Sequence, residues 1–225
     1  MNPSQALMPH TSEPRCPPNR IRPTSSTTRR CATGSRPPAS RYATTRSRAS
    51  RAADAAQGAG AVRLRYADTL GLLDPFGTYE RIGALRRATD LDIEIHAHND
   101  LGLATANTLA ALRAGATHAS TTVNGLGERA GNAPLEEIVM GLRHLHGIES
   151  GVDSRALPAL SRLVVEASGR RIAESKCIVG EAVFSHESGI HVDGLMKDRR
   201  NYEAFDPAEV GRSHRIVLGK HSGSA

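Results

Sequence analysis

The chain has 225 residues, three scattered cysteines and a formal net charge of +6, and this length can bury a core in one large or two small domains. Residues 1–51 hold ten arginines and one acidic residue, a net charge of +9, whereas the rest carries −3. The basic excess is therefore local, and we expect no nucleic-acid partner. The cysteines give neither a disulfide framework nor a Cys-rich zinc site. No apolar run approaches the ~20 residues of a membrane span, so we expect a cytoplasmic protein that does not bind membranes.

Residues 1–51 form a leader of unusual composition. Eight of the twelve prolines lie here, and large apolar residues are almost absent, so we expect disorder. The Arg-rich, Ser-rich, acid-poor composition is typical of an organellar transit peptide. We favour a second interpretation, in which an out-of-frame or misassigned start joins a genuine coding sequence near Arg51. RNA binding through the arginines ranks third.

After residue 51 the sequence alternates between strand and helix patterns. Asp74 before Pro75 is typical of a helix N-cap followed by proline in the first turn. Three successive strand–helix units predict a parallel sheet, either doubly wound or part of a (β/α)8 barrel. The predicted strands are 61–68, the stretch after Asp90 that carries both His96 and His98, and 117–123. The first predicted helix starts at Asp74-Pro75 and has an apolar stripe of Phe76, Tyr79, Ile82 and Leu85; the next two are 102–113 and 134–146.

Two histidines stand at the end of the second predicted strand. Successive strand residues alternate between faces, so His96 and His98 share one face while Ile93 and Ile95 take the other. Neutral imidazole is the commonest nitrogen ligand of divalent metals, and this spacing allows both rings to bind one ion. A His-x-His pair with no other motif around it would more often be part of the polar face of a half-buried strand. The loop residue Thr69 and the glycine-rich loop 124–132 fall at the same, carboxyl ends of the strands, where such folds place their chemistry.

These motifs together resemble the Claisen-condensing, metal-dependent acyltransferases built on a TIM barrel. That family includes isopropylmalate, homocitrate and citramalate synthases and, more distantly, the HMG-CoA lyases. The resemblance covers roughly residues 52–223, with all motifs in the family's order. They are Asp68-Thr69-Leu70-Gly71, His96 to Gly102, Asn124 to Asn132, Gly189 to Gly194, and Leu218 to Gly223.

The resemblance implies a role for several residues around a divalent metal, which could be magnesium, manganese or zinc. His96 and His98 would be metal ligands and Asn132 would lie beside the ion, although Asn132 could also cap the following helix. Thr69 would bind the carboxylate of a 2-oxo acid. Glu128 would handle a proton or orient acetyl-CoA; otherwise it is a solvated loop acid.

A segment after the barrel would supply the catalytic base. In the family this segment comes from the neighbouring subunit of a homodimer, which implies catalytic roles for His191 and Tyr202 in the partner's active site. Val192, where an isopropylmalate synthase would show glutamine, favours a homocitrate synthase of the nitrogen-fixation type. Such an enzyme joins acetyl-CoA to 2-oxoglutarate and supplies homocitrate to the nitrogenase iron–molybdenum cofactor. Isopropylmalate and citramalate synthase remain alternatives.

The expected domains are the leader, 1–51; the last three or so strand–helix units of a partial TIM barrel, 52–150; and a small helical post-barrel subdomain, 151–225, that looks clipped. The family's metal-binding Asp and catalytic Arg of the first barrel strand have no counterpart in the leader. We therefore expect a truncated chain with weakened metal binding and little turnover alone. The non-enzymatic alternative is a truncated subunit that pairs with a full-length copy.

Overall fold

The computed structural model describes residues 50–217. The predicted disorder of the leader and the motif Leu218 to Gly223 fall outside the described residues, apart from Ser50 and Arg51, which lie in a helix over 50–58. No helix within the described range is long and apolar enough to cross a membrane.

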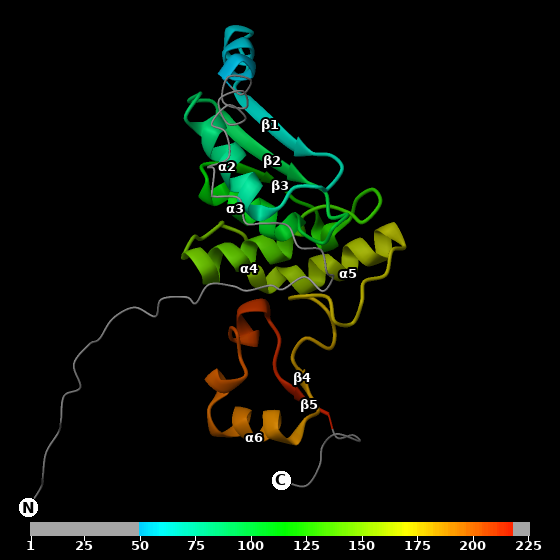
Figure 1. Ribbon diagram of the computed structural model, residues 1–225. Helices are drawn as coiled ribbons and strands as arrows, with labels where there is room; N and C mark the ends of the chain where they lie inside the picture. The colour runs from blue at the N-terminus through cyan, green and yellow to red at the C-terminus, as the bar shows by residue number, and fades with distance from the viewer. Residues whose placement is uncertain (1–49, 218–225) are drawn as a thin grey trace, which may run out of the picture. The chain divides into compact units, whose positions relative to one another are not determined.

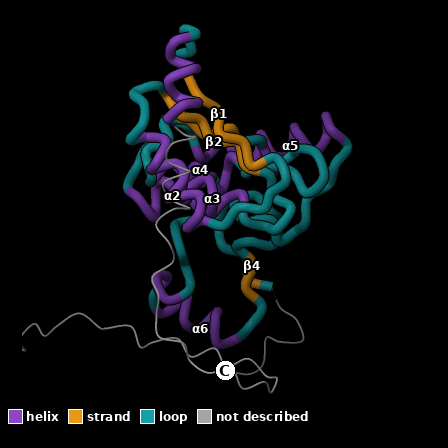
Figure 2. The backbone as a smooth tube through the Cα atoms, turned by 45° about the horizontal axis from the view of Figure 1, so that its top comes forward, coloured by secondary structure: helices purple, strands orange, loops and turns teal. Residues whose placement is uncertain are grey.

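A three-stranded parallel sheet forms the centre of the first half (Figure 1). The strands β1 (Arg63–Asp68), β2 (Asp92–Ala97) and β3 (His118–Ser120) lie in the order β1-β2-β3, with Ile95 paired to Tyr66 and Ala119. Helix α2 (Pro75–Arg86) links β1 to β2, α3 (Ala104–Arg113) links β2 to β3, and α4 (Leu135–His146) follows β3. Figure 2 shows the sheet and these helices from a second direction. The predicted series of parallel strand–helix units is confirmed.

The core lies between β2 and the helices. Ile93, Ile95 and Ala97 are fully buried and pack in one cluster with Ile82 of α2 and Ala111 of α3. This alternation leaves the intervening side chains of β2 on the other face of the sheet. The hydrophobic pattern of the strand therefore fixes the direction in which His96 points.

Two predicted details are wrong. Phe76 and Tyr79 do not belong to the buried stripe, since they are 82% and 53% exposed. The buried positions of α2 are Thr78, Ile82 and Leu85, whose spacing of four and three residues keeps them on one side of the helix. The third strand is also shorter than expected, because residues 123–125 form a 3-10 turn in which Asn124 has a positive φ of 61°.

The predicted N-cap of α2 is confirmed and gives a testable effect. The Asp74 carboxylate accepts hydrogen bonds from the backbone N–H groups of Phe76 and Gly77, both at 3.0 Å. Asp74→Ala removes this cap and should lower the free energy of unfolding by about 1 kcal/mol in urea titrations. Asp74→Ser, which keeps a capping oxygen, should stay close to the wild type; an equal loss in both variants would contradict the capping role.

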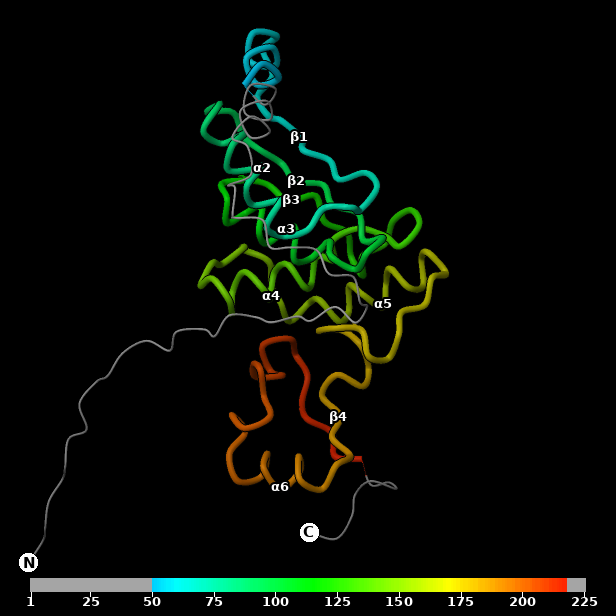
Figure 3. The backbone as a smooth tube through the Cα atoms, viewed as in Figure 1, coloured from blue at the N-terminus to red at the C-terminus, as the bar shows by residue number. Residues whose placement is uncertain are grey.

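The second half contains one long helix and several short elements joined by loops (Figure 3). Helix α5 (Leu157–Ser168) is followed by β4 (Ser185–His186), α6 (Gly189–Lys197) and β5 (Arg215–Ile216). The 3-10 turns are η1 (Val123–Gly125), η2 (Ser154–Ala156), η3 (Arg199–Asn201) and η4 (Pro207–Val210). The parallel β4–β5 pair is an addition to the expected helical subdomain. The second core comprises Val139, Met140, Leu157, Val179, Phe184 and Val210.

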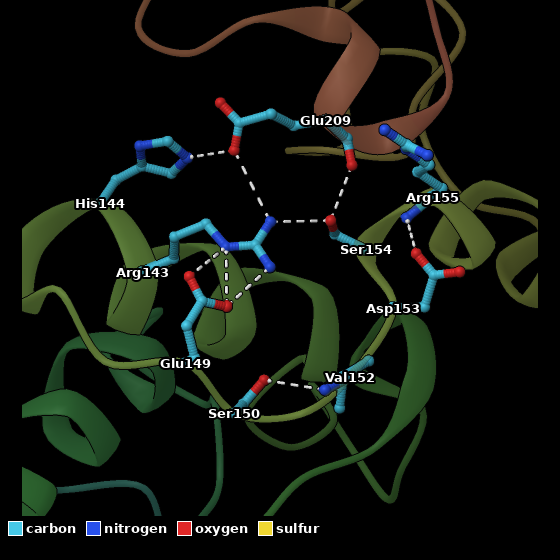
Figure 4. Close-up of polar contacts among 9 residues, drawn as sticks. All are labelled: Arg143, His144, Glu149, Ser150, Val152, Asp153, Ser154, Arg155 and Glu209. Carbon is cyan, nitrogen blue, oxygen red and sulfur yellow. Dashed lines mark hydrogen bonds and ion pairs between the residues drawn. The ribbon is translucent and has the colours of Figure 1, made fainter.

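A polar network joins the end of α4 to η2 and η4 (Figure 4). Arg143 donates to the Glu149 carboxylate at 2.9 Å and to the Ser154 hydroxyl at 2.8 Å. That hydroxyl donates to the backbone carbonyl of Glu209 at 2.7 Å, and the Glu209 side chain lies 3.0 Å from His144 Nε2. These bonds hold η4 against the end of α4, beside the second core.

Candidate functional site

The two histidines predicted as ligands lie together at the carboxyl end of β2. Their ring centroids are 5.0 Å apart, with the rings edge to face. His96 Nδ1 lies 3.1 Å from the Ser120 hydroxyl, and its Nε2 lies 3.4 Å from the Asn132 amide nitrogen. Asn132 also forms a backbone bridge with His98. The structure therefore gathers all three predicted metal-site residues.

The protonation of this cluster suits metal binding. Partial burial lowers the pKa of His96, and the neighbouring charges of His98 and Arg65 lower it further. A histidine must be neutral to offer a lone pair to a metal. The contact with Ser120 can fix the proton on Nδ1, which leaves the Nε2 lone pair of His96 to accept from the Asn132 amide N–H. A metal ion would take the place of that N–H, with the amide oxygen of Asn132 as its ligand.

A buried ring nitrogen of His98 gives further support for a metal site at this point. Nδ1 of His98 is buried and has no hydrogen-bond partner among residues 50–217, and such an atom costs about 1–3 kcal/mol when nothing compensates it. Within residues 50–217 no three His, Cys, Asp or Glu side chains form a metal-binding group. The two imidazoles and the amide thus fit part of a coordination shell for a divalent ion.

The glycine-rich loop is shaped to present Asn132. A Cβ at position 127 would collide with the Asn132 Oδ1, and one at Gly131, where φ is +89°, would collide with the Gly125 carbonyl oxygen. Glycine is the residue that tolerates both demands. The predicted N-cap role of Asn132 is wrong: the cap position of α4 is Pro134, which provides no side-chain cap bond. The Asn132 side chain is therefore available to face His96.

An ion pair that the sequence analysis missed links the three strand-end loops. Arg129 donates to both oxygens of Asp100, at 2.8 and 2.9 Å, and to the backbone carbonyl of Thr69 at 2.5 Å. These bonds from Arg129 hold the pKa of Asp100 below its usual value. Both residues lie within the quoted motifs, but nothing in their local pattern pairs them. Thr69 itself is exposed.

The remaining predicted catalytic residues lie apart from this cluster. The rings of His191 in α6 and Tyr202, which follows η3, are in contact, with centroids 4.5 Å apart and planes tilted by 35°. In the described part of the chain, neither ring has a hydrogen bond or ring contact with His96 or His98. Glu128 is exposed in the glycine-rich loop, and its carboxylate has no hydrogen bond or ion pair to any described residue.

Close to His191 the structure holds a hydrogen-bonded chain that the sequence did not reveal. His186 Nε2 lies 3.0 Å from His214 Nδ1, and His214 Nε2 lies 2.9 Å from the Glu203 carboxylate. The side chains of His214 and Glu203 are only 13% and 14% exposed. Burial lowers the pKa of His186 below its usual 6.5, and the positive charges of His214 and His191 lower it further.

This lowered pKa predicts a pH-dependent stability. Below about pH 6.5 the unfolded chain binds a proton at residue 186 more readily than the folded chain does. The free energy of unfolding should therefore fall as the pH drops from about 7.5 to about 5.5. Urea titrations across this range should give a shallower slope for His186→Gln than for the wild type. Equal slopes for His186→Gln and the wild type would show that His186 does not contribute to the pH dependence of stability.

The parallel strand–helix units, with polar residues gathered at the carboxyl ends of the strands, define a protein of the α/β class. The chain belongs to the HMGL-like family of TIM-barrel proteins: the sequence model of that family matches residues 22–164. A second model, described as homocitrate synthase post-HMGL domain-like, matches residues 178–225. The first match begins inside the segment 1–51.

Two curated relatives have different named products. The chain is 56% identical over 170 residues to 2-isopropylmalate synthase 2 of Caldanaerobacter subterraneus subsp. tengcongensis, covering 76% of this chain and 44% of the relative. It is also 56% identical over 166 residues to homocitrate synthase of Frankia alni, covering 74% and 47%. The chain thus spans less than half the length of these relatives.

Among solved structures, HMG-CoA lyase of Bacillus subtilis superposes with a TM-score of 0.51 at 27% identity. The match covers 56% of this chain and 45% of the lyase. This agreement supports the assignment to the family and its fold.

Proposed function

We propose that this chain carries part of the active site of a condensing acyltransferase, which joins acetyl-CoA to a 2-oxo acid. The observation that carries the proposal is the cluster of His96, His98 and Asn132 at the carboxyl end of β2, in a chain of the HMGL-like family. Residues 52–150 would be the last strand–helix units of the barrel, and 151–225 the post-barrel subdomain. The protein would act in the cytoplasm as a homodimer.

In this proposal the residues at the strand ends bind the metal ion and the oxo acid. His96, His98 and Asn132 would hold a divalent ion, which supplies Lewis-acid polarisation of the 2-oxo group when bound. Ser120 keeps the lone pair of His96 directed at the site. Thr69, at the end of β1, would donate its hydroxyl proton to the carboxylate of the oxo acid.

Residues of the post-barrel segment would remove the proton from acetyl-CoA. His191, whose ring contacts that of Tyr202, would remove a proton from the acetyl methyl group in the active site of the partner subunit. The carbanion then adds to the keto carbon, and water releases CoA from the thioester. Glu128 would orient acetyl-CoA or return a proton.

The proposed acceptor is 2-oxoglutarate, which gives homocitrate for the nitrogenase cofactor. Equal identity to relatives named for isopropylmalate and for homocitrate does not separate the acceptors. The preference for 2-oxoglutarate rests on Val192 and its neighbours, since they lie in the segment matched by the homocitrate synthase post-HMGL model. The alternatives are 3-methyl-2-oxobutanoate and pyruvate.

The test measures CoA thiol release and oxo-acid binding with the purified chain. Acetyl-CoA is offered with each of the three oxo acids in the presence of magnesium, manganese or zinc. We expect calorimetry to detect metal-dependent binding that is tightest for 2-oxoglutarate, together with slow release by the chain alone. Tighter binding of another oxo acid would replace the proposed acceptor. Absence of binding for all three would overturn the function.

A second candidate follows from an unpaired edge of the sheet. In the described residues β1 has a single strand neighbour, β2, and an open edge is a template for pairing with another chain. A non-enzymatic subunit that completes its barrel with a full-length copy would use this edge. Co-purification of the tagged chain with such a copy supports this role, and its absence counts against it.

A further inference from the structure

Four successive backbone N–H groups in the glycine-rich loop lack an acceptor. Those of residues 127–130 donate no hydrogen bond to any described residue, whereas the flanking Leu126 and Gly131 donate to Val123 and Glu128. Positive φ angles at Arg129, 53°, and Gly131, 89°, bend this stretch. Consecutive N–H groups in such a bend commonly form a concave anion site.

The same loop borders a small, positively charged pocket. The pocket has a volume of about 140 Å³, and its lining includes Arg129, Arg170 and Arg171 but no acidic residue. Arg170 donates to the Gly127 carbonyl at 2.7 Å, so it is held against the loop. The guanidinium of Arg171 has no hydrogen bond or ion pair within the described residues.

The balance of charge favours an anion even after local pairing is counted. Asp100 neutralises Arg129, and Glu128 on the exposed side of the loop adds one negative charge. Arg170 and Arg171 remain as two cations beside unpartnered N–H donors. Guanidinium groups and free backbone N–H groups are the usual ligands of phosphate.

We propose that this arginine-lined pocket binds a phosphate or diphosphate group. If the proposed function holds, the source of that group is the nucleotide end of CoA. A larger pocket of about 590 Å³ shares Asn124, Gly125 and Ala130 with the arginine-lined pocket and is also lined by Asn132. The two pockets adjoin along the loop, so a CoA molecule that reaches Asn132 would have its phosphates near the arginine-lined pocket.

The test titrates the full 225-residue chain with sodium pyrophosphate and, separately, with CoA. Calorimetry should detect both ligands, with affinity falling as salt rises, and NMR should show the amide signals of residues 127–130 shifting. Arg170→Ala with Arg171→Ala should weaken pyrophosphate binding roughly ten-fold or more. Arg171→Ala alone is the second variant, because it leaves the bond from Arg170 to Gly127 in place.

The matched control is Arg113→Ala, which removes one exposed arginine from the last turn of α3. It should leave both affinities unchanged. If Arg113→Ala weakens pyrophosphate binding as much as Arg171→Ala does, or if pyrophosphate does not bind at all, the proposal that this pocket binds phosphate is wrong. Pyrophosphate binding without CoA binding keeps the phosphate site and rejects CoA as its source. Binding of pyrophosphate and CoA without binding of any of the three oxo acids rejects the proposed function and keeps the inference.

Discussion

His98→Ala is expected to weaken binding of a divalent ion roughly a hundred-fold or more, because even the residues that merely support metal ligands contribute up to about that factor. The substitution removes one of two imidazoles that lie 5.0 Å apart. It also removes the buried Nδ1, which has no hydrogen-bond partner in the described part of the chain, so the metal-free protein should lose little stability. Calorimetric titration with manganese, magnesium and zinc measures the affinity, and urea unfolding without metal measures the stability.

Two variants make this expectation specific. His146→Ala, in the last turn of α4, also deletes one imidazole and should leave metal affinity unchanged. Ser120→Ala removes the contact to His96 Nδ1 and should weaken binding by an intermediate amount, about ten-fold. If His98→Ala binds metal as tightly as His146→Ala does, then His98 is not a ligand and the proposed site is wrong.

Local sequence patterns predicted the parts of this site that depend on alternation and on backbone shape. The alternation of β2 placed the isoleucines in the core, and the two rings predicted to share the other face do lie together. The glycines at 125, 127 and 131 fit a loop whose backbone passes close to a ligand, which stays a prediction; in the structure a Cβ at any of these positions would be crowded by the protein itself. Both signals are local, because the residues that carry them lie within a few positions of one another.

The missed features all join residues that are distant along the chain. Arg129 and Asp100 are 29 residues apart, and His186 and His214 are 28 apart. An arginine, an aspartate or a histidine alone does not indicate its partner, which only the folded chain brings near. The exposed Phe76 has a related cause: the helical pattern allows several phases, and contact with the sheet selects Thr78 and Ile82 instead.

Lys176→Met is expected to lower the free energy of unfolding by about 3–5 kcal/mol, since it breaks a buried ion pair by removing one partner. Glu136 is 1% exposed, its Oε1 lies 3.3 Å from Lys176 Nζ, and that oxygen has no hydrogen bond to any described residue. Lys176 also pairs with Glu137. The substitution leaves both carboxylates without their cation, and urea unfolding measures the loss.

The control for this effect is an exposed lysine–carboxylate pair. Lys197 and Asp193 of α6 lie 2.7 Å apart, with side chains 72% and 49% exposed, so Lys197→Met should cost less than about 1 kcal/mol. Adding Glu136→Gln to Lys176→Met should recover part of the stability, because the buried charge is gone while an oxygen remains for the Asn124 N–H that now donates to Glu136. Equal losses in Lys176→Met and Lys197→Met would contradict a buried pair. Lys176→Met should also weaken metal binding, because Glu136 holds Asn124 and Asn124 begins the loop that ends at Asn132. Calorimetry at a temperature below the unfolding transition can detect this loss of affinity.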